Sequence, residues 1–137
     1  MADIDARFAK DIARASDVPS GILAMTDTFA ELTQLSSRYL PLFLEFWLQS
    51  VRDPQIWRRT TAPYKNYVDR FNLIFEKGVS QGSIRGINPK EASYTLIGLA
   101  LGLLLQNMMS PDTENWSVVS KNCIGLLIHG LQGEPIA

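Results

Sequence analysis

Apolar residues recur at intervals of three and four along most of the chain, which is the spacing of one face of an α-helix. No segment alternates apolar and polar residues between turn residues, so the pattern gives no sign of a β-strand. We therefore predict an all-α domain of about six helices. The first covers residues 3–15, where Ile4, Phe8 and Ile12 share one face, and the turn-forming segment 17–21 ends it.

Two shorter helices are expected next. An apolar stripe from Ile22 to Leu35 predicts the second helix. Two serines and Pro41 interrupt this stripe, and proline lacks the backbone N–H that a helix interior requires. We therefore predict a separate third helix over residues 41–51, which is dense in aromatic side chains.

A long fourth helix is expected to begin at Asp53-Pro54 and to end near Val79. An aspartate side chain caps the first backbone N–H groups of a helix, and proline is favoured at the first helical position. Pro63 lies inside this segment, so we predict a kink or break near Thr60.

The fifth helix, from Asn88-Pro89 to Met109, is apolar nearly all the way round. Such a helix has no polar face to present to water, so we expect burial on two sides. At about 100° per residue, we assign one face to Tyr94, Gly98, Leu101, Leu105 and Met108, and the opposite face to Ala92, Leu96, Leu99, Leu103 and Gln106. The first face is predicted to meet a second copy of the chain, and the second face an internal pocket.

The sixth helix, predicted over about residues 112–131, carries a similarly wide apolar arc. Two neighbouring helices with excess apolar surface can pair with the same two helices of a second chain and form a two-fold four-helix bundle. A well-covered monomeric core is the alternative. The predicted dimer interface comprises Tyr94, Gly98, Leu101, Leu105, Cys123, Leu127 and Leu131.

Composition narrows the class of protein. The 137 residues fit one domain, and a net charge of -1 argues against a basic nucleic-acid-binding surface. A single cysteine excludes an internal disulfide, and the charged, amphipathic start of the chain is no signal peptide. The apolar run from Tyr94 to Met109 is shorter than the roughly 18–20 residues of a membrane span. We expect a soluble, cytoplasmic protein without a membrane partner.

Groups that could perform catalysis are sparse. His129 is the sole histidine, so a site with two histidine ligands for a metal is excluded. Cys123 lies on an apolar helix face and is read as a packed thiol rather than a nucleophile. We expect no metal, no cofactor and no enzymatic activity. A small helical enzyme would need an acid–base pair such as Glu45 with Tyr67, and that is the least favoured alternative.

Aromatic side chains are the stronger functional signal, since Trp and Tyr combine an apolar body with a polar group and often line pockets. The same side chains could equally form an ordinary core, and the domain would then be a structural dimerisation module without a ligand. The predicted ligand-binding residues are Phe43, Trp47, Tyr67, Phe71, Leu99, Leu103 and Gln106.

Three passages resemble the C-terminal, ligand-binding and dimerisation domain of the TetR family of transcriptional regulators. They are Leu42–Trp47 (LFLEFW) followed by residues 52–54 (RDP), the helix end and glycine turn of residues 67–85, and the long helix of residues 88–106. The likeness covers most of the chain from about Ile22 onward. Each motif is degenerate, and the specificity comes from their order and spacing.

The resemblance implies a one-component sensor with the bundle architecture of that family. A small apolar or aromatic effector would bind inside one domain, 1–137, and alter the separation of two DNA-binding heads in a homodimer. Nothing in the chain matches the family's N-terminal helix-turn-helix head, so we expect a truncated piece of a longer regulator or a headless relative, and favour truncation. DNA would then be bound only through the absent head.

Overall fold

The computed structural model describes residues 2–133, and within them the side chains of all residues except 2–5 and 32–38. Helices dominate this range, and no strand occurs in it, which confirms the all-α class. The predicted side-chain positions of Ile4 and Leu35 lie outside the described residues. The helices in chain order are α1 (Ala2–Arg14), α2 (Val18–Ser50), α3 (Pro54–Gln81), α4 (Pro89–Met109) and α5 (Trp116–Gln132).

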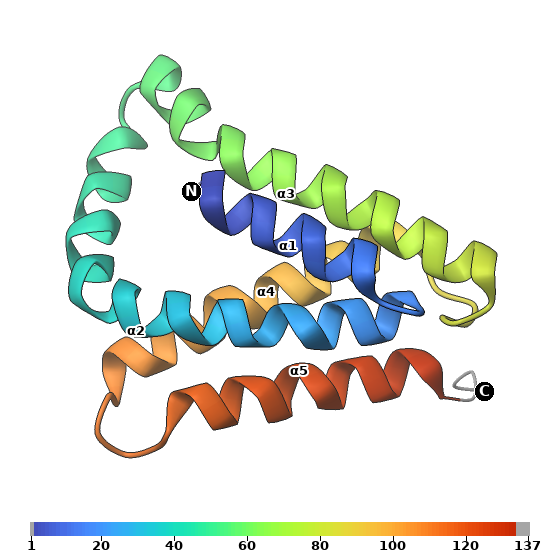
Figure 1. Cartoon of the computed structure of the whole chain (residues 1–137). Coiled ribbons are helices and arrows are strands. Elements are labelled where there is room, and N and C mark those ends of the chain that lie inside the picture. Colours follow the sequence, from blue (N-terminus) through green and yellow to red (C-terminus); the bar gives the residue numbers. More distant parts are fainter. Residues whose placement is uncertain (1, 134–137) are drawn as a thin grey trace.

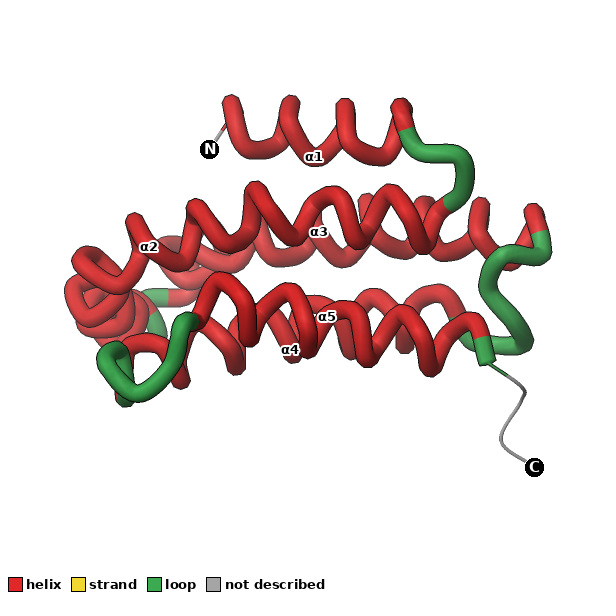
Figure 2. Tube along the Cα trace, turned by 60° about the horizontal axis from the view of Figure 1, so that its bottom comes forward, coloured by secondary structure: helices red, strands yellow, loops and turns green. Residues whose placement is uncertain are grey.

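The helices lie in three layers (Figure 2). α1 forms one outer layer, α2 and α3 the middle one, and α4 and α5 the other outer layer. α1 packs on α2, α3 packs on α4, and α5 packs mainly on α2 although the two are far apart in sequence. α2 is therefore the central element, because every other helix contacts it.

One long helix, α2, replaces the two helices predicted over residues 22–35 and 41–51. Pro41 lies inside it rather than at a boundary. Proline removes one backbone donor and crowds the carbonyl four residues earlier. Because α2 continues through Pro41, the effect is a bend and not an end of the helix. Figure 1 shows the bend: the second part of α2 turns away from α5 and runs towards the start of α3. We call this second part, residues 39–50, the arm.

Side-chain caps fix where the later helices begin. The Asp53 carboxylate accepts from the backbone N–H of Gln55 at 2.9 Å, and the Asn88 side chain accepts from the N–H of Lys90 at 2.9 Å. Both predicted starts are confirmed. The start predicted near residue 112 is wrong, because Asn115 is the capping residue of α5 and Trp116 its first residue.

Pro63 does not break α3, which is continuous from Pro54 to Gln81. Two threonine hydroxyls in the preceding turn bond to helix carbonyls. Thr60 donates to the carbonyl of Ile56 at 2.9 Å and Thr61 donates to that of Trp57 at 3.0 Å. These bonds satisfy the two hydroxyls within the helix, and the carbonyl that lacks its helical donor at Pro63 is that of Arg59.

The core forms where α2, α3, α4 and α5 meet, and its most fully buried large side chain is Phe75. The turn after α3 contributes Ile84 to this core. Gly82 ends α3 in the left-handed conformation, with φ of 78°, and the N–H groups of Ser83 and Ile84 bond to the carbonyl of Gly78. Other core members are Val18, Ile22, Phe29, Ala92, Leu96, Leu103, Ile124 and Ile128.

Gly78→Ala is expected to lower the free energy of unfolding by about 1–3 kcal/mol, because it overfills the core. An added Cβ would lie 2.7 Å from Cδ1 of Ile84 and 3.3 Å from Cβ of Val18. Both side chains are buried, so neither yields without moving others. Urea unfolding followed by circular dichroism measures the change.

Gly130→Ala is the matched control, since no heavy atom lies within 4 Å of its added Cβ. It should leave stability unchanged or raise it by up to about 1 kcal/mol through helix propensity. If G78A were as stable as G130A, the close approach of Ile84 would not constrain this turn.

Candidate functional site

The arm exposes a continuous apolar surface. Tyr39, Leu42, Phe43 and Phe46 are each more than half exposed. They are spaced by three, four and seven residues, so they share one side of the helix. A contiguous exposed apolar surface is a candidate binding surface.

An open hollow of about 530 Å³ lies against this surface. All of its lining side chains come from the arm itself, so it is an open surface hollow and not an enclosed cavity. Most of the lining is apolar, and its polar groups are a carboxylate, an amide and the hydroxyl of Tyr39. The lining side chains are Tyr39, Leu42, Phe43, Glu45, Phe46 and Gln49.

An aromatic cluster supports the arm beside the hollow. The ring centroids of Phe43 and Trp47 are 6.0 Å apart, and those of Trp47 and Trp57 are 5.5 Å apart with the rings steeply inclined at 63°. Trp57 belongs to α3, so this contact joins the arm to the next helix. The indole Nε1 of Trp47 is buried, and it has no hydrogen-bond acceptor among the described residues.

The predicted ligand-binding residues fall into separate groups. Phe43 lines the hollow, whereas Trp47 is not a lining residue and lies with its ring centroid 6.0 Å from that of Phe43. Phe71 and Leu99 are partly buried against the core, and Leu103 belongs to the core itself. Tyr67 is partly buried on α3, under the guanidinium of Arg70 at 5.9 Å from its ring centroid.

Gln106 is exposed, so the expectation that it lies on an inward face of α4 is wrong. The eight residues between Gly98 and Gln106 correspond to about 80° around a helix, not to opposite sides. Gln106 therefore sits at the edge between the buried and the exposed sides of α4.

Five residues of the hollow were not among the predicted site residues: Tyr39, Leu42, Glu45, Phe46 and Gln49. Their helical spacing was visible in the sequence, and Phe46 belongs to the aromatic segment singled out there. This spacing does not predict the direction in which the arm runs. The bend before Pro41 turns this stripe outward instead of into the core.

The side of α4 that faces away from α3 is apolar and exposed. It carries Tyr94, Gly98, Leu101 and Leu105, and we call it the bare side of α4. Tyr94, Leu101 and Leu105 are exposed there, as the two-faced pattern predicts. Gly98 and Gly102 add small residues, and a Cβ built on either meets no heavy atom within 4 Å. A second helix could therefore approach this side closely.

The exposed residues of α5 differ from the predicted ones. Cys123, Leu127 and Leu131 are half-buried and pack against the core of their own chain. Val118 and Leu126 are instead the exposed apolar residues, and Leu126 is 79% exposed. The apolar arc that the sequence predicts for this helix is too wide to show which side packs on α2 and which side faces solvent.

α4 is also long and apolar enough to cross a membrane, judged by length and composition alone. Its most apolar stretch is only 28% buried. A core helix of a soluble protein also passes this test, but such a helix is mostly buried. The α4 helix differs from it, because one side of α4 is exposed. Among the described residues nothing covers this apolar side of α4.

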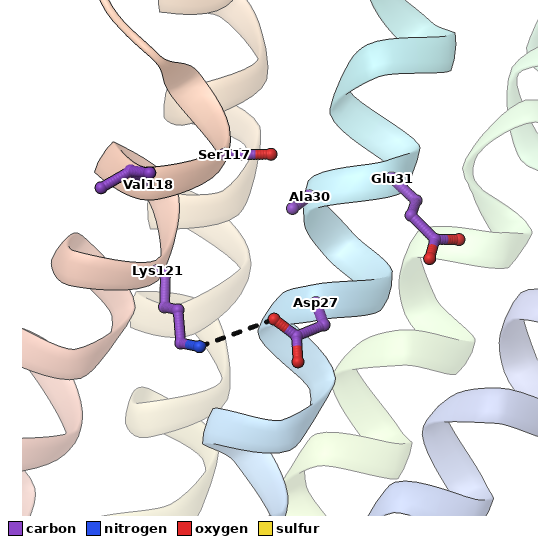
Figure 3. A pocket seen from close by; sticks show the side chains of 6 residues that line it. All are labelled: Asp27, Ala30, Glu31, Ser117, Val118 and Lys121. Carbon is purple, nitrogen blue, oxygen red and sulfur yellow. Dashed lines mark ion pairs between the residues drawn. The ribbon is translucent and has the colours of Figure 1, made fainter.

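A second, shallower hollow of about 300 Å³ lies between α2 and α5 (Figure 3). Asp27 and Lys121 face each other across it, with Oδ1 and Nζ 3.7 Å apart, and both are largely exposed. Glu31 points away from α5 and pairs with Arg7 of α1 at 2.7 Å, which lowers the pKa of the Glu31 carboxyl. Exposed pairs of this kind contribute little stability, and the hollow has no aromatic lining.

No group of three or more His, Cys, Asp or Glu side chains that could hold a metal ion occurs in the part of the chain that the structure describes. Two candidate functional surfaces remain, namely the arm with its hollow and the bare side of α4.

Comparison with known proteins gives one match. The family model described as the C-terminal domain of BetI-type transcriptional repressors matches residues 20–119. No curated protein and no solved structure matches the chain significantly. The matched residues run from the first turn of α2 into the first turn of α5, so they include the arm, its hollow and all of α4.

Proposed function

Because this chain belongs to the family of C-terminal domains of BetI-type transcriptional repressors, within the TetR family, we propose that it senses a small effector and forms a homodimer. The family is one of transcriptional regulators and not of enzymes. A cytoplasmic location is part of the same proposal. DNA binding would be performed by a helix-turn-helix head and not by the residues described here.

The arm supports effector binding. It combines exposed aromatic rings, an adjoining hollow of about 530 Å³ and a buried donor without an acceptor in the described part of the chain. Apolar walls with a few polar groups are typical of small-molecule sites. We propose an apolar or aromatic effector, bound against Phe43 and Phe46, with Trp47 at the edge of the site.

The bare side of α4 supports dimerisation, and it is the single observation that carries this part of the proposal. Tyr94, Leu101 and Leu105 are apolar and exposed, and Gly98 leaves room for a facing helix. Pairing through a two-fold axis would cover this surface twice with one interface. We propose that Leu126 of α5 joins it, with Cys123 and Leu127 supporting it from within.

Light scattering coupled to gel filtration at about 10 μM tests the dimer, and the expected mass is twice the 15.3 kDa of one chain. Thermal unfolding with aromatic compounds tests the effector, since a ligand at a hundred times its Kd stabilises the folded state by about 2.7 kcal/mol. The variant Phe46→Asp should lose this shift and keep the dimer mass.

The two parts of the proposal fail separately. A monomeric mass at this concentration contradicts the dimer. A dimer that no aromatic compound stabilises would instead be a structural dimerisation module without a ligand.

A further inference from the structure

We infer that the effector is a neutral apolar molecule carrying a hydrogen-bond acceptor, which it places on the indole N–H of Trp47. This inference rests on the proposed effector site in the arm. It assigns Trp47 as the residue that selects for the polar group of the ligand, whereas the rings of Phe43 and Phe46 bind its apolar part.

The first observation is the state of the Trp47 indole nitrogen. Nε1 is buried, and no acceptor for it occurs among the described residues. A buried donor without an acceptor is costly, and most tryptophan N–H groups find a partner when buried. The Ser50 hydroxyl donates to the carbonyl of Trp47 at 2.9 Å and makes no hydrogen bond with the indole.

The second observation is the position of Trp47 relative to the hollow. Its ring contacts that of Phe43, one turn earlier on the same helix, and Phe43 lines the hollow. Its ring also lies against that of Trp57 on α3, with the centroids 5.5 Å apart. Phe43 is half exposed, so its ring has room to change rotamer, and the inference requires that this movement lets the ligand reach the indole.

The third observation concerns charge. Glu45 is the charged side chain in the lining, and it is exposed. A carboxylate at this place disfavours an anionic ligand through repulsion, although water weakens the effect. The acceptor is therefore a carbonyl, ether or hydroxyl oxygen rather than a carboxylate.

Matched probes test this assignment on the full chain. 2-Acetylnaphthalene offers a neutral carbonyl, 2-isopropylnaphthalene has nearly the same shape without an acceptor, and 2-naphthoate carries a negative charge. Titration calorimetry gives the Kd of each for the wild-type chain, Trp47→Phe and Trp57→Phe. Both substitutions keep an aromatic ring and remove one indole N–H, so Trp57→Phe is the matched control.

We expect the preference for the acetyl over the isopropyl probe to fall about 3- to 10-fold in W47F and to stay unchanged in W57F. Taking the ratio of the two Kd values cancels the general hydrophobicity of the probes. 2-Naphthoate should bind about 3- to 10-fold more weakly than the acetyl probe, and Glu45→Gln should narrow that gap.

A measurement on the wild-type chain guards against misfolding of W47F. The sequence contains three tryptophans, so a ¹⁵N spectrum shows three indole N–H signals. The acetyl probe should move the assigned Trp47 signal downfield, and the isopropyl probe should not.

The outcomes distinguish the role of Trp47 from the existence of the effector site. An acetyl preference that survives in W47F, or an unmoved Trp47 signal with bound probe, overturns the assignment of Trp47 while leaving the effector site in place. If neither neutral probe binds the folded wild-type chain up to its solubility limit, both the effector site and this inference are overturned.

Discussion

Phe75→Ala should lower the free energy of unfolding by about 3–5 kcal/mol, the usual cost of deleting a fully buried phenylalanine ring. Phe75 has no exposed surface and belongs to the cluster joining α2, α3, α4 and α5. Its loss leaves a cavity between four helices that cannot all move inward together. Because a domain of this size has about 5–15 kcal/mol of total stability, the variant should be close to unfolding.

Urea unfolding at fixed protein concentration measures this change, and the melting temperature should fall by about 10 °C or more. Leu73→Ala is the control, since Leu73 lies two residues earlier on α3 and is 65% exposed. It should change stability by less than about 0.5 kcal/mol. Equal losses in the two variants would show that α3 does not bury the face assigned to it.

Leu101→Glu should raise the dissociation constant of the proposed dimer by more than about 100-fold. Leu101 lies at the centre of the bare side of α4, next to Gly98 and between Tyr94 and Leu105. In a two-fold interface the substitution buries two carboxylates near each other, and unpaired buried charge is strongly unfavourable. At about 10 μM the variant should have the mass of a single chain, 15.3 kDa.

Leu73→Glu is the control for this variant as well, because it introduces the same charge on an exposed apolar position of α3. It should leave the dimer intact. Sedimentation velocity over a range of concentrations distinguishes the two. A dimer that tolerates a glutamate at position 101 would place the interface elsewhere.

Local signals in the sequence predicted the helix starts at Asp53 and Asn88, but missed that of α2, which begins at Val18, capped by Asp17, inside the predicted turn of residues 17–21. Asp53 and Asn88 act through hydrogen bonds to N–H groups two or three residues ahead, so neighbouring residues suffice to locate them. The start of α5 was missed because Asp112 and Asn115 are both plausible caps. The helix begins after Asn115, and there the Trp116 indole makes a longer-range bond, donating to the carbonyl of Ser110 at 2.8 Å.

The site was harder to predict than the fold, for a geometrical reason. Periodicity shows which residues share a side of a helix, and it grouped Phe43 with Trp47 correctly. It does not show what lies opposite that side. Whether Pro41 would separate two helices or bend one depended on tertiary packing, and that bend decides that Tyr39 and Phe46 border a hollow instead of the core.

The pairing of α5 with α2 sets the order in which the chain can fold. α2 begins at Val18 and α5 at Trp116, so the two surfaces that meet are separated by most of the chain. Contacts between neighbours, α1 with α2 and α3 with α4, can form early because their loop-closure entropy is small. The side of α2 that receives α5 therefore stays uncovered until residues 116–132 are available to pack on it. Ile124 and Ile128 of α5 belong to the core, so the core remains incomplete until this helix docks on α2.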